Sequence, residues 1–95
     1  MTTYILKKSN RKGKRFVIIM DGMKHHFGSD VGKTYIDGRT DKERQAWIAR
    51  HRVDKNWDNP HSGIYYSRYL LWTERSLKDA IKKLEQKDKI KIKVD

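Results

Sequence analysis

The stretch Lys14–Phe27, KRFVIIMDGMKHHF, decides the fold. It opens with a run of aromatic and β-branched residues, which favours a central β-strand. An Asp-Gly pair follows directly, and this pair suits a tight I′ turn because the turn needs positive φ at both central residues. We therefore predict a hairpin with strands at 14–20 and 23–27, joined by Asp21 and Gly22.

Strand patterns also lie on either side of this hairpin. Residues 3–8 predict a first strand, joined to the hairpin by the polar loop 9–13, so that residues 3–27 form a meander. At the other end, residues 89–94 alternate lysine with Ile90, Ile92 and Val94, as in a half-buried strand at a sheet edge. A frayed basic tail is the other interpretation of that segment.

Three helices are predicted between these strand regions. Residues 28–38 read as an ordered loop or a short edge strand, and Thr40 and Glu43 then match a capping box for a helix ending near Arg52. A second helix, about 62–72, is apolar almost all round and should be buried. A third begins at Ser76, a plausible N-cap.

These elements predict one α+β domain over residues 1–95. We expect a three- to four-stranded, mostly antiparallel sheet, made of the N-terminal meander and the C-terminal strand, with about three helices packed on one face. The ten aromatic residues help so short a chain to build a core. There is no cysteine, no apolar run long enough to span a membrane, and no signal-like start, so we expect an intracellular protein that is not secreted.

Positive charge dominates the composition and concentrates at the two ends. The chain has 23 Lys and Arg against 12 Asp and Glu, a net charge of +11. Residues 1–35 and 63–95 carry nearly all of this excess, whereas residues 36–62 are almost balanced. Such an excess favours a polyanionic partner through long-range attraction. Nucleic acid is the partner that we expect.

Three groups of basic residues are candidates for phosphate contacts. The basic residues on either side of the loop 9–13 project as a group, or wing, that could contact phosphates; the alternative is that they belong to an ordinary solvated loop. Lysines of the last helix could add to it or simply be exposed. Arginines near Trp57, Tyr65 and Tyr66 could stack on bases, or could order the helices through cation–π contacts and ion pairs with Asp54 or Asp58. The candidates are Lys7, Lys8, Arg11, Lys12, Lys14, Arg15, Lys24, Arg50, Arg52, Arg68, Lys82 and Lys83.

No pattern in the sequence supports catalysis, a metal site or a cofactor. The four histidines lack zinc-site spacing, and Asp54-x-Asn56-x-Asp58 lacks the later ligands of a calcium loop. Residues 28–34 contain Gly-Lys-Thr, but only three residues separate the two glycines where a phosphate loop needs four. We therefore expect a binding protein rather than an enzyme.

The segment 27–81 resembles a family of small uncharacterised basic proteins of large (giant) DNA viruses. The resemblance implies a viral origin, an α+β fold and a location in the host cell or the virion, and it implies no activity. Its second helix has Tyr65, Tyr66 and Tyr69 where more tryptophan is expected. The similar residues are Phe27, Gly28, Tyr35, Asp41, Lys42, Glu43, Arg44, Ile48, Ala49, Arg50, His51, Asn56, Trp57, Pro60, Gly63, Ser67, Arg68, Leu70, Leu71, Trp72, Ser76, Leu77 and Ile81.

Two functions are therefore open at this point. The first is sequence-nonspecific binding of DNA or RNA, driven by phosphate contacts. The alternative is a virion structural or adaptor protein that docks on an acidic protein surface or on copies of itself, with the 89–94 strand available for pairing with another chain.

Overall fold

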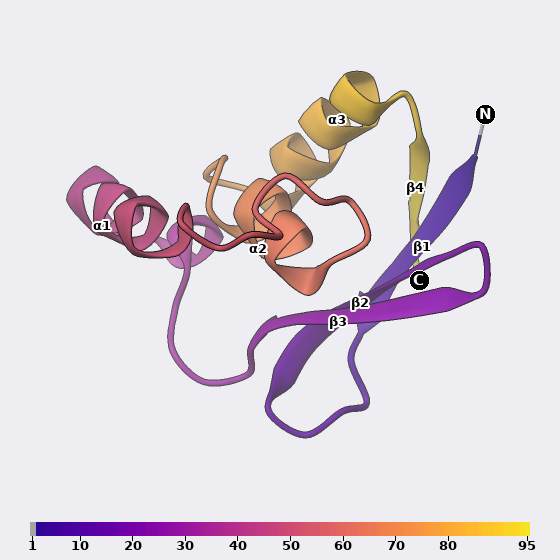
Figure 1. The fold of residues 1–95 in the computed structure, drawn as a ribbon, viewed down its shortest axis with the longest axis horizontal. Coiled ribbons are helices and arrows are strands. Elements are labelled where there is room, and N and C mark those ends of the chain that lie inside the picture. Colours follow the sequence, from indigo (N-terminus) through magenta and orange to yellow (C-terminus); the bar gives the residue numbers. More distant parts are fainter. Residues whose placement is uncertain (1) are drawn as a thin grey trace.

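A computed structural model describes residues 2–95, which form an α+β fold as the sequence predicts (Figure 1). A four-stranded sheet carries the N-terminal hairpin, and three α-helices follow it in the chain. The elements in order are β1 (Thr3–Lys8), β2 (Lys14–Met20), β3 (Met23–Ser29), the 3-10 helix η1 (Tyr35–Asp37), α1 (Asp41–His51), α2 (Gly63–Leu71), α3 (Leu77–Asp88) and β4 (Lys91–Val94).

The predicted hairpin lies at one side of the sheet. Asp21 and Gly22 both have positive φ, 49° and 78°, which confirms the tight turn between β2 and β3. The strand order is β3-β2-β1-β4, with antiparallel pairing in the meander. β4 runs parallel to β1, so the sheet is mixed.

The C-terminal segment is an edge strand, not a frayed tail. Ile90 and Ile92 are buried as expected, whereas Val94, the last residue of this edge strand, is 59% exposed. The backbone N–H of Ile92 donates to a Glu85 side-chain oxygen at 2.8 Å, which ties β4 to α3.

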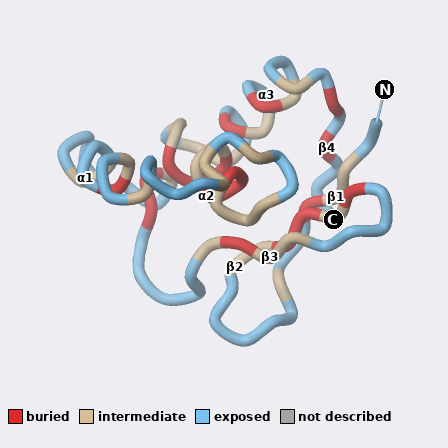
Figure 2. Tube along the Cα trace, in the orientation of Figure 1, coloured by how far each residue is buried: buried red, intermediate tan, exposed pale blue. Residues whose placement is uncertain are grey.

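The core lies between the sheet and α2. Leu70 and Leu71 are fully buried, and Tyr66 of the same helix packs on Phe27 of β3. Figure 2 shows buried segments in the strands and in the helices. The helix approaches the strand very closely where it begins. A Cβ atom on Gly63 would lie only 2.7 Å from the carbonyl oxygen of His26, so glycine allows α2 to contact the strand backbone.

Helix α1 departs from the predicted arrangement. Its capping box is confirmed, with the Thr40 hydroxyl accepting from the backbone N–H of Glu43 at 3.2 Å. The helix packs mainly on η1 and on the end of α2, where Trp47 stacks on Trp72 at 5.0 Å, and does not lie over the sheet with the other two helices (Figure 1). Gly28 and Ser29 end β3, and residues 30–38 form a loop and η1, not a separate edge strand.

Helix α3 completes the helical layer and contacts α2 and β4. The Ser76 hydroxyl accepts from the backbone N–H of Asp79, which confirms the predicted N-cap. The Tyr65 hydroxyl donates to Asp88 at 2.7 Å and thereby links α2 to the end of α3. Within residues 2–95 no helix has the length and apolar character needed to cross a membrane.

Candidate nucleic-acid interface

The β1–β2 loop is an ordered turn. The backbone N–H of Lys14 donates to the carbonyl of Arg11 at 3.1 Å, and that of Ser9 donates to the carbonyl of Arg15 at 3.1 Å. The Ser9 hydroxyl also hydrogen-bonds His26 of β3, 2.7 Å between Oγ and Nδ1. The basic side chains of the loop therefore project from a fixed backbone.

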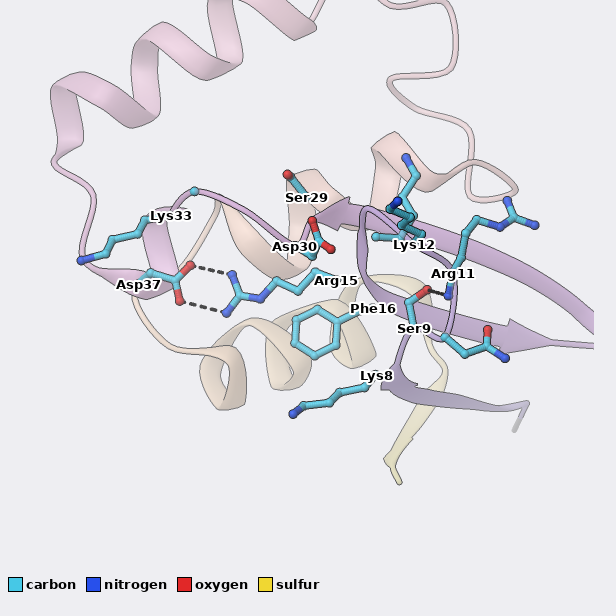
Figure 3. Close-up of a pocket in the computed structure, with 13 residues that line it drawn as sticks. Lys8, Ser9, Arg11, Lys12, Arg15, Phe16, Ser29, Asp30, Lys33 and Asp37 are labelled. Carbon is cyan, nitrogen blue, oxygen red and sulfur yellow. Dashed lines mark hydrogen bonds and ion pairs between the residues drawn. The ribbon is translucent and has the colours of Figure 1, made fainter.

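A broad, open hollow of about 900 Å³ lies against this loop (Figure 3). The segment 29–34 folds back to form its other border, and the backbone N–H of Asp30 donates to the carbonyl of Gly13 at 3.3 Å. This bond brings Lys33 to the same hollow as the loop. We call it the basic hollow, and its lining is Lys8, Ser9, Asn10, Arg11, Lys12, Lys14, Arg15, Phe16, Ser29, Asp30, Gly32, Lys33 and Asp37.

Five of the six basic side chains that line the basic hollow take no part in the ion pairs found within residues 2–95. They come from the end of β1, the loop, the start of β2 and the segment before η1. The exposed carboxylate of Asp30 is the acidic group that opposes them. The unpaired residues are Lys8, Arg11, Lys12, Lys14 and Lys33.

Arg15, the sixth basic residue, has a structural role at the wall of the hollow. Its guanidinium holds the Asp37 carboxylate through two hydrogen bonds, of 2.5 and 2.9 Å (Figure 3). Asp37 also accepts from the backbone N–H and the hydroxyl of Thr34. The bond from Arg15 is the main cause that keeps the pKa of Asp37 well below its ordinary value. The pair therefore fixes η1 to β2 and is not free to bind an anion.

The pKa of His26, which lies beside the basic loop, is lower than its ordinary value. Desolvation lowers the pKa of its imidazole, and the positive charges of Arg11, Lys24 and Lys14 lower it further. The ring is therefore neutral at pH 7 and can keep its hydrogen bond to Ser9.

Several predicted contact residues lie elsewhere on the molecule. Lys7 follows the buried Leu6, and Lys24 precedes His25, which pairs with the buried Ile18; both lysines therefore lie on the face of the sheet away from α2. The two lysines of α3 named in the sequence prediction, Lys82 and Lys83, are exposed, and Lys83 pairs with Glu74 at 3.2 Å.

The three candidate arginines near the aromatic residues, Arg50, Arg52 and Arg68, have different surroundings. Arg68 pairs with Asp58 at 2.9 Å and lies over the rings of Trp57 and Tyr69, at 4.2 and 4.6 Å, so it has the structural role that was the alternative for it. Arg50 and Arg52 are exposed at the end of α1.

Lys33 is the residue of the basic hollow that the sequence prediction missed. It lies in the Gly-Lys-Thr stretch that fails the spacing of a phosphate loop, and the helix that follows it is the one-turn 3-10 helix η1, not an α-helix. The signal that could have found it was the pair of glycines at 28 and 32, which allow the chain to turn back toward β2. Its position depends on a hydrogen bond between two loops that are distant in the sequence.

The histidines do not gather into a metal site. His25 and His61 lie side by side, with ring centroids 6.3 Å apart. Within residues 2–95, no three His, Asp or Glu side chains converge on a point where a metal ion could be held.

A comparison with known protein families adds one finding. A sequence model described as a family of unknown function (DUF5754) matches residues 4–51, half of the chain. The chain belongs to this family. Neither a curated protein nor a solved structure matches it. The DUF5754 region spans the meander, η1 and α1, and so contains the whole lining of the basic hollow.

Proposed function

We propose that this protein binds nucleic acid without sequence specificity, with the sugar-phosphate backbone lying in the basic hollow. The observation that carries the proposal is the convergence of five unpaired basic side chains on one open surface. Phosphate contacts of this kind supply nearly all of the affinity in nonspecific binding, because each one releases condensed counterions.

The surroundings of these cations suit phosphates. The loop is held by backbone hydrogen bonds, so binding does not have to order it. Asn10 is exposed beside the basic side chains, and amides of this kind are common partners of phosphate oxygens. The Arg15–Asp37 pair braces the wall and adds no net charge. Asp30 subtracts one charge, which leaves the hollow clearly positive.

Salt-dependent binding tests this proposal. Labelled single-stranded DNA, duplex DNA and RNA are titrated over a range of salt concentrations, with heparin as a competitor. One variant carries Arg11→Ala, Lys12→Ala and Lys14→Ala, and its matched control carries Lys78→Ala, Lys82→Ala and Lys83→Ala on α3. Each variant removes three positive charges, so the two differ in where the charge is lost.

The hollow variant should lose three phosphate contacts. Its plot of log K against log salt should therefore be shallower than that of the parent by about 2.7 on duplex DNA and by about 2 on single strands. The slope of log K against log salt for the α3 control should differ from that of the parent by less than about one. Equal changes in the two variants would mean that only net charge matters, and the absence of binding at low salt would refute the proposal.

Docking on an acidic protein or on a second copy remains the alternative. β4 is an edge strand, but it is four residues long and carries Lys91 and Lys93, features that discourage pairing with another strand. We therefore place this function second. Light scattering without nucleic acid distinguishes the two, because self-assembly would give an oligomer whose mass does not depend on salt.

A further inference from the structure

A second hollow, of about 490 Å³, lies between the segment 28–34 and the helices α1 and α2. We call it the aromatic hollow. It shares Lys14, Ser29, Gly32 and Lys33 with the basic hollow, so the two have a common border. Its lining is Gly13, Lys14, Gly28, Ser29, Val31, Gly32, Lys33, Thr34, Trp47, His51, Ile64, Ser67, Leu71 and Trp72.

Flat and apolar groups line the helical side of the aromatic hollow. Trp47 and Trp72 stack nearly parallel, at 10° and 5.0 Å between ring centroids, and His51 lies 4.5 Å from Trp47. Leu71 and Ile64 of α2 complete this side. Such a lining favours a flat heterocycle over a chain of polar atoms.

Two polar side chains of the aromatic hollow are free to bind a ligand. Ser67 is only 9% exposed, and its hydroxyl makes no hydrogen bond with the side chains or backbone of residues 2–95. Ser67 belongs to the lining of the hollow, so a ligand there lies beside it. Burial, followed by the charge of Arg50, lowers the pKa of His51, which is therefore neutral at pH 7 and offers one donor and one acceptor.

We propose that the aromatic hollow receives one unpaired nucleobase of a single strand whose phosphates lie in the basic hollow. This rests on the proposed function and names its substrate class. Lys14 and Lys33 border both hollows, so a phosphate held by them has its own base within reach of the aromatic side. The apolar lining suits the faces of a base, and Ser67 and His51 suit its edge.

The path continues past the aromatic hollow. A third hollow, of about 310 Å³, shares Lys33, Trp47 and Trp72 with it and reaches Arg50 of α1. Arg50 forms none of the ion pairs found within residues 2–95 and is positioned to meet the next phosphate of the strand. A base in a duplex is paired and stacked, so it cannot enter a recess between two helices unless it is first extruded.

The test compares four probes on the full-length protein. They are a short single strand of mixed sequence, the same strand with abasic sites, the same strand annealed to its complement, and AMP. The abasic strand keeps the phosphates and lacks bases, so it separates the two hollows. The variants are Ser67→Val, which replaces the hydroxyl with a methyl group and adds a second methyl group to the lining, and His51→Ala. Circular dichroism confirms that each is folded.

The parent should bind the intact strand on the order of 10-fold more tightly than the abasic strand. Both variants should lose this preference and keep the salt slope of the parent, because their phosphate contacts are intact. The intact strand should also bind more tightly than the duplex, and binding should quench tryptophan fluorescence.

Three results would overturn the inference. Equal binding of intact and abasic strands would refute the base pocket while leaving phosphate binding in place. Binding of AMP as tight as that of the strand would assign the hollow to a free nucleotide. If no nucleic acid binds at low salt, the proposed function fails, and the base pocket fails with it.

Discussion

The contact between β3 and α2 can be tested by adding one methyl group at Gly28. This residue lies within β3 and has a φ of +76°. A Cβ atom there would lie 2.9 Å from Cδ1 of Leu71 and 3.2 Å from Cβ of Arg15. Leu71 is fully buried, so it has little room to move. Gly28→Ala should therefore overpack the contact between strand and helix.

Gly13 supplies a matched control for the backbone conformation. Its φ is +84°, close to that of Gly28, but a Cβ atom there has no neighbour within 4 Å. Both alanine variants incur the strain of a left-handed conformation, which costs roughly 1–2 kcal/mol. Gly28→Ala alone adds overpacking, which typically costs about 1–3 kcal/mol. The free energy of unfolding should therefore be about 1–3 kcal/mol lower for Gly28→Ala than for Gly13→Ala.

Urea denaturation followed by tryptophan fluorescence measures this difference. Trp47 and Trp72 are buried near the end of α2, so their emission reports on the loss of the core. The slope of the unfolding free energy against urea should be the same in both variants, so that a shift in midpoint reports on stability alone.

A double-mutant cycle then tests the cause. Leu71→Val removes the terminal methyl carbon that the new Cβ atom would meet. In that background Gly28→Ala should cost less than it does in the parent, because the two changes share one contact and are not additive. It should still cost more than Gly13→Ala, because the Cβ atom of Arg15 remains 3.2 Å from the added carbon. The steric argument is refuted if Gly28→Ala and Gly13→Ala destabilise equally, or if the cost of Gly28→Ala is the same with and without Leu71→Val.

Two further predictions concern pH. Asp37→Asn should lower the unfolding free energy at pH 7. The Arg15 bond holds the pKa of Asp37 down, so the carboxylate stabilises the fold at pH values above its unfolded pKa of about 4. The difference in unfolding free energy between variant and parent should therefore be smaller at pH 3 than at pH 7, as denaturation at the two pH values can show. Burial, and then the charge of His61, lowers the pKa of His25, so the unfolded chain takes up a proton at a higher pH than the folded chain and stability falls as the pH drops below about 6.5. His25→Phe should therefore make the unfolding free energy less dependent on pH between 7 and 5. An unchanged dependence would contradict this.

Local patterns predicted most of the fold correctly. The turn at Asp21 and Gly22 depends on backbone φ, and the caps at Thr40 and Ser76 depend on hydrogen bonds to residues three positions away. The residues that determine such a turn or cap lie within a few positions of one another, so a short stretch of sequence is enough to predict it. The parallel pairing of β4 with β1 was not predicted, because it joins the two ends of the chain and has no turn residue to mark it.

The candidate site was predicted only in part. The cations of the β1–β2 loop are neighbours in the sequence, so their common position follows from the pairing of β1 with β2 alone. Lys33 and the aromatic side chains reach the site through the folding back of 29–34 and the packing of α1 on α2, contacts that periodicity does not show. Arg68 shows why the sequence left two interpretations open, because an arginine beside aromatic residues has the same sequence pattern whether it binds a ligand or braces two elements.

The distribution of acidic residues explains why the free charge lies where it does. The acids of the nearly balanced middle of the chain brace arginines both inside and outside that segment, as in the pairs Arg39–Glu43 and Arg68–Asp58. The β1–β2 loop has no acid of its own, and of the two carboxylates that line the basic hollow, Asp37 is committed to Arg15. Neighbouring cations therefore stay unpaired in the folded chain, and a polyanion that binds them does not have to break an existing ion pair. For this reason the position of the unpaired cations, and not the total of +11, is the property that points to a binding surface.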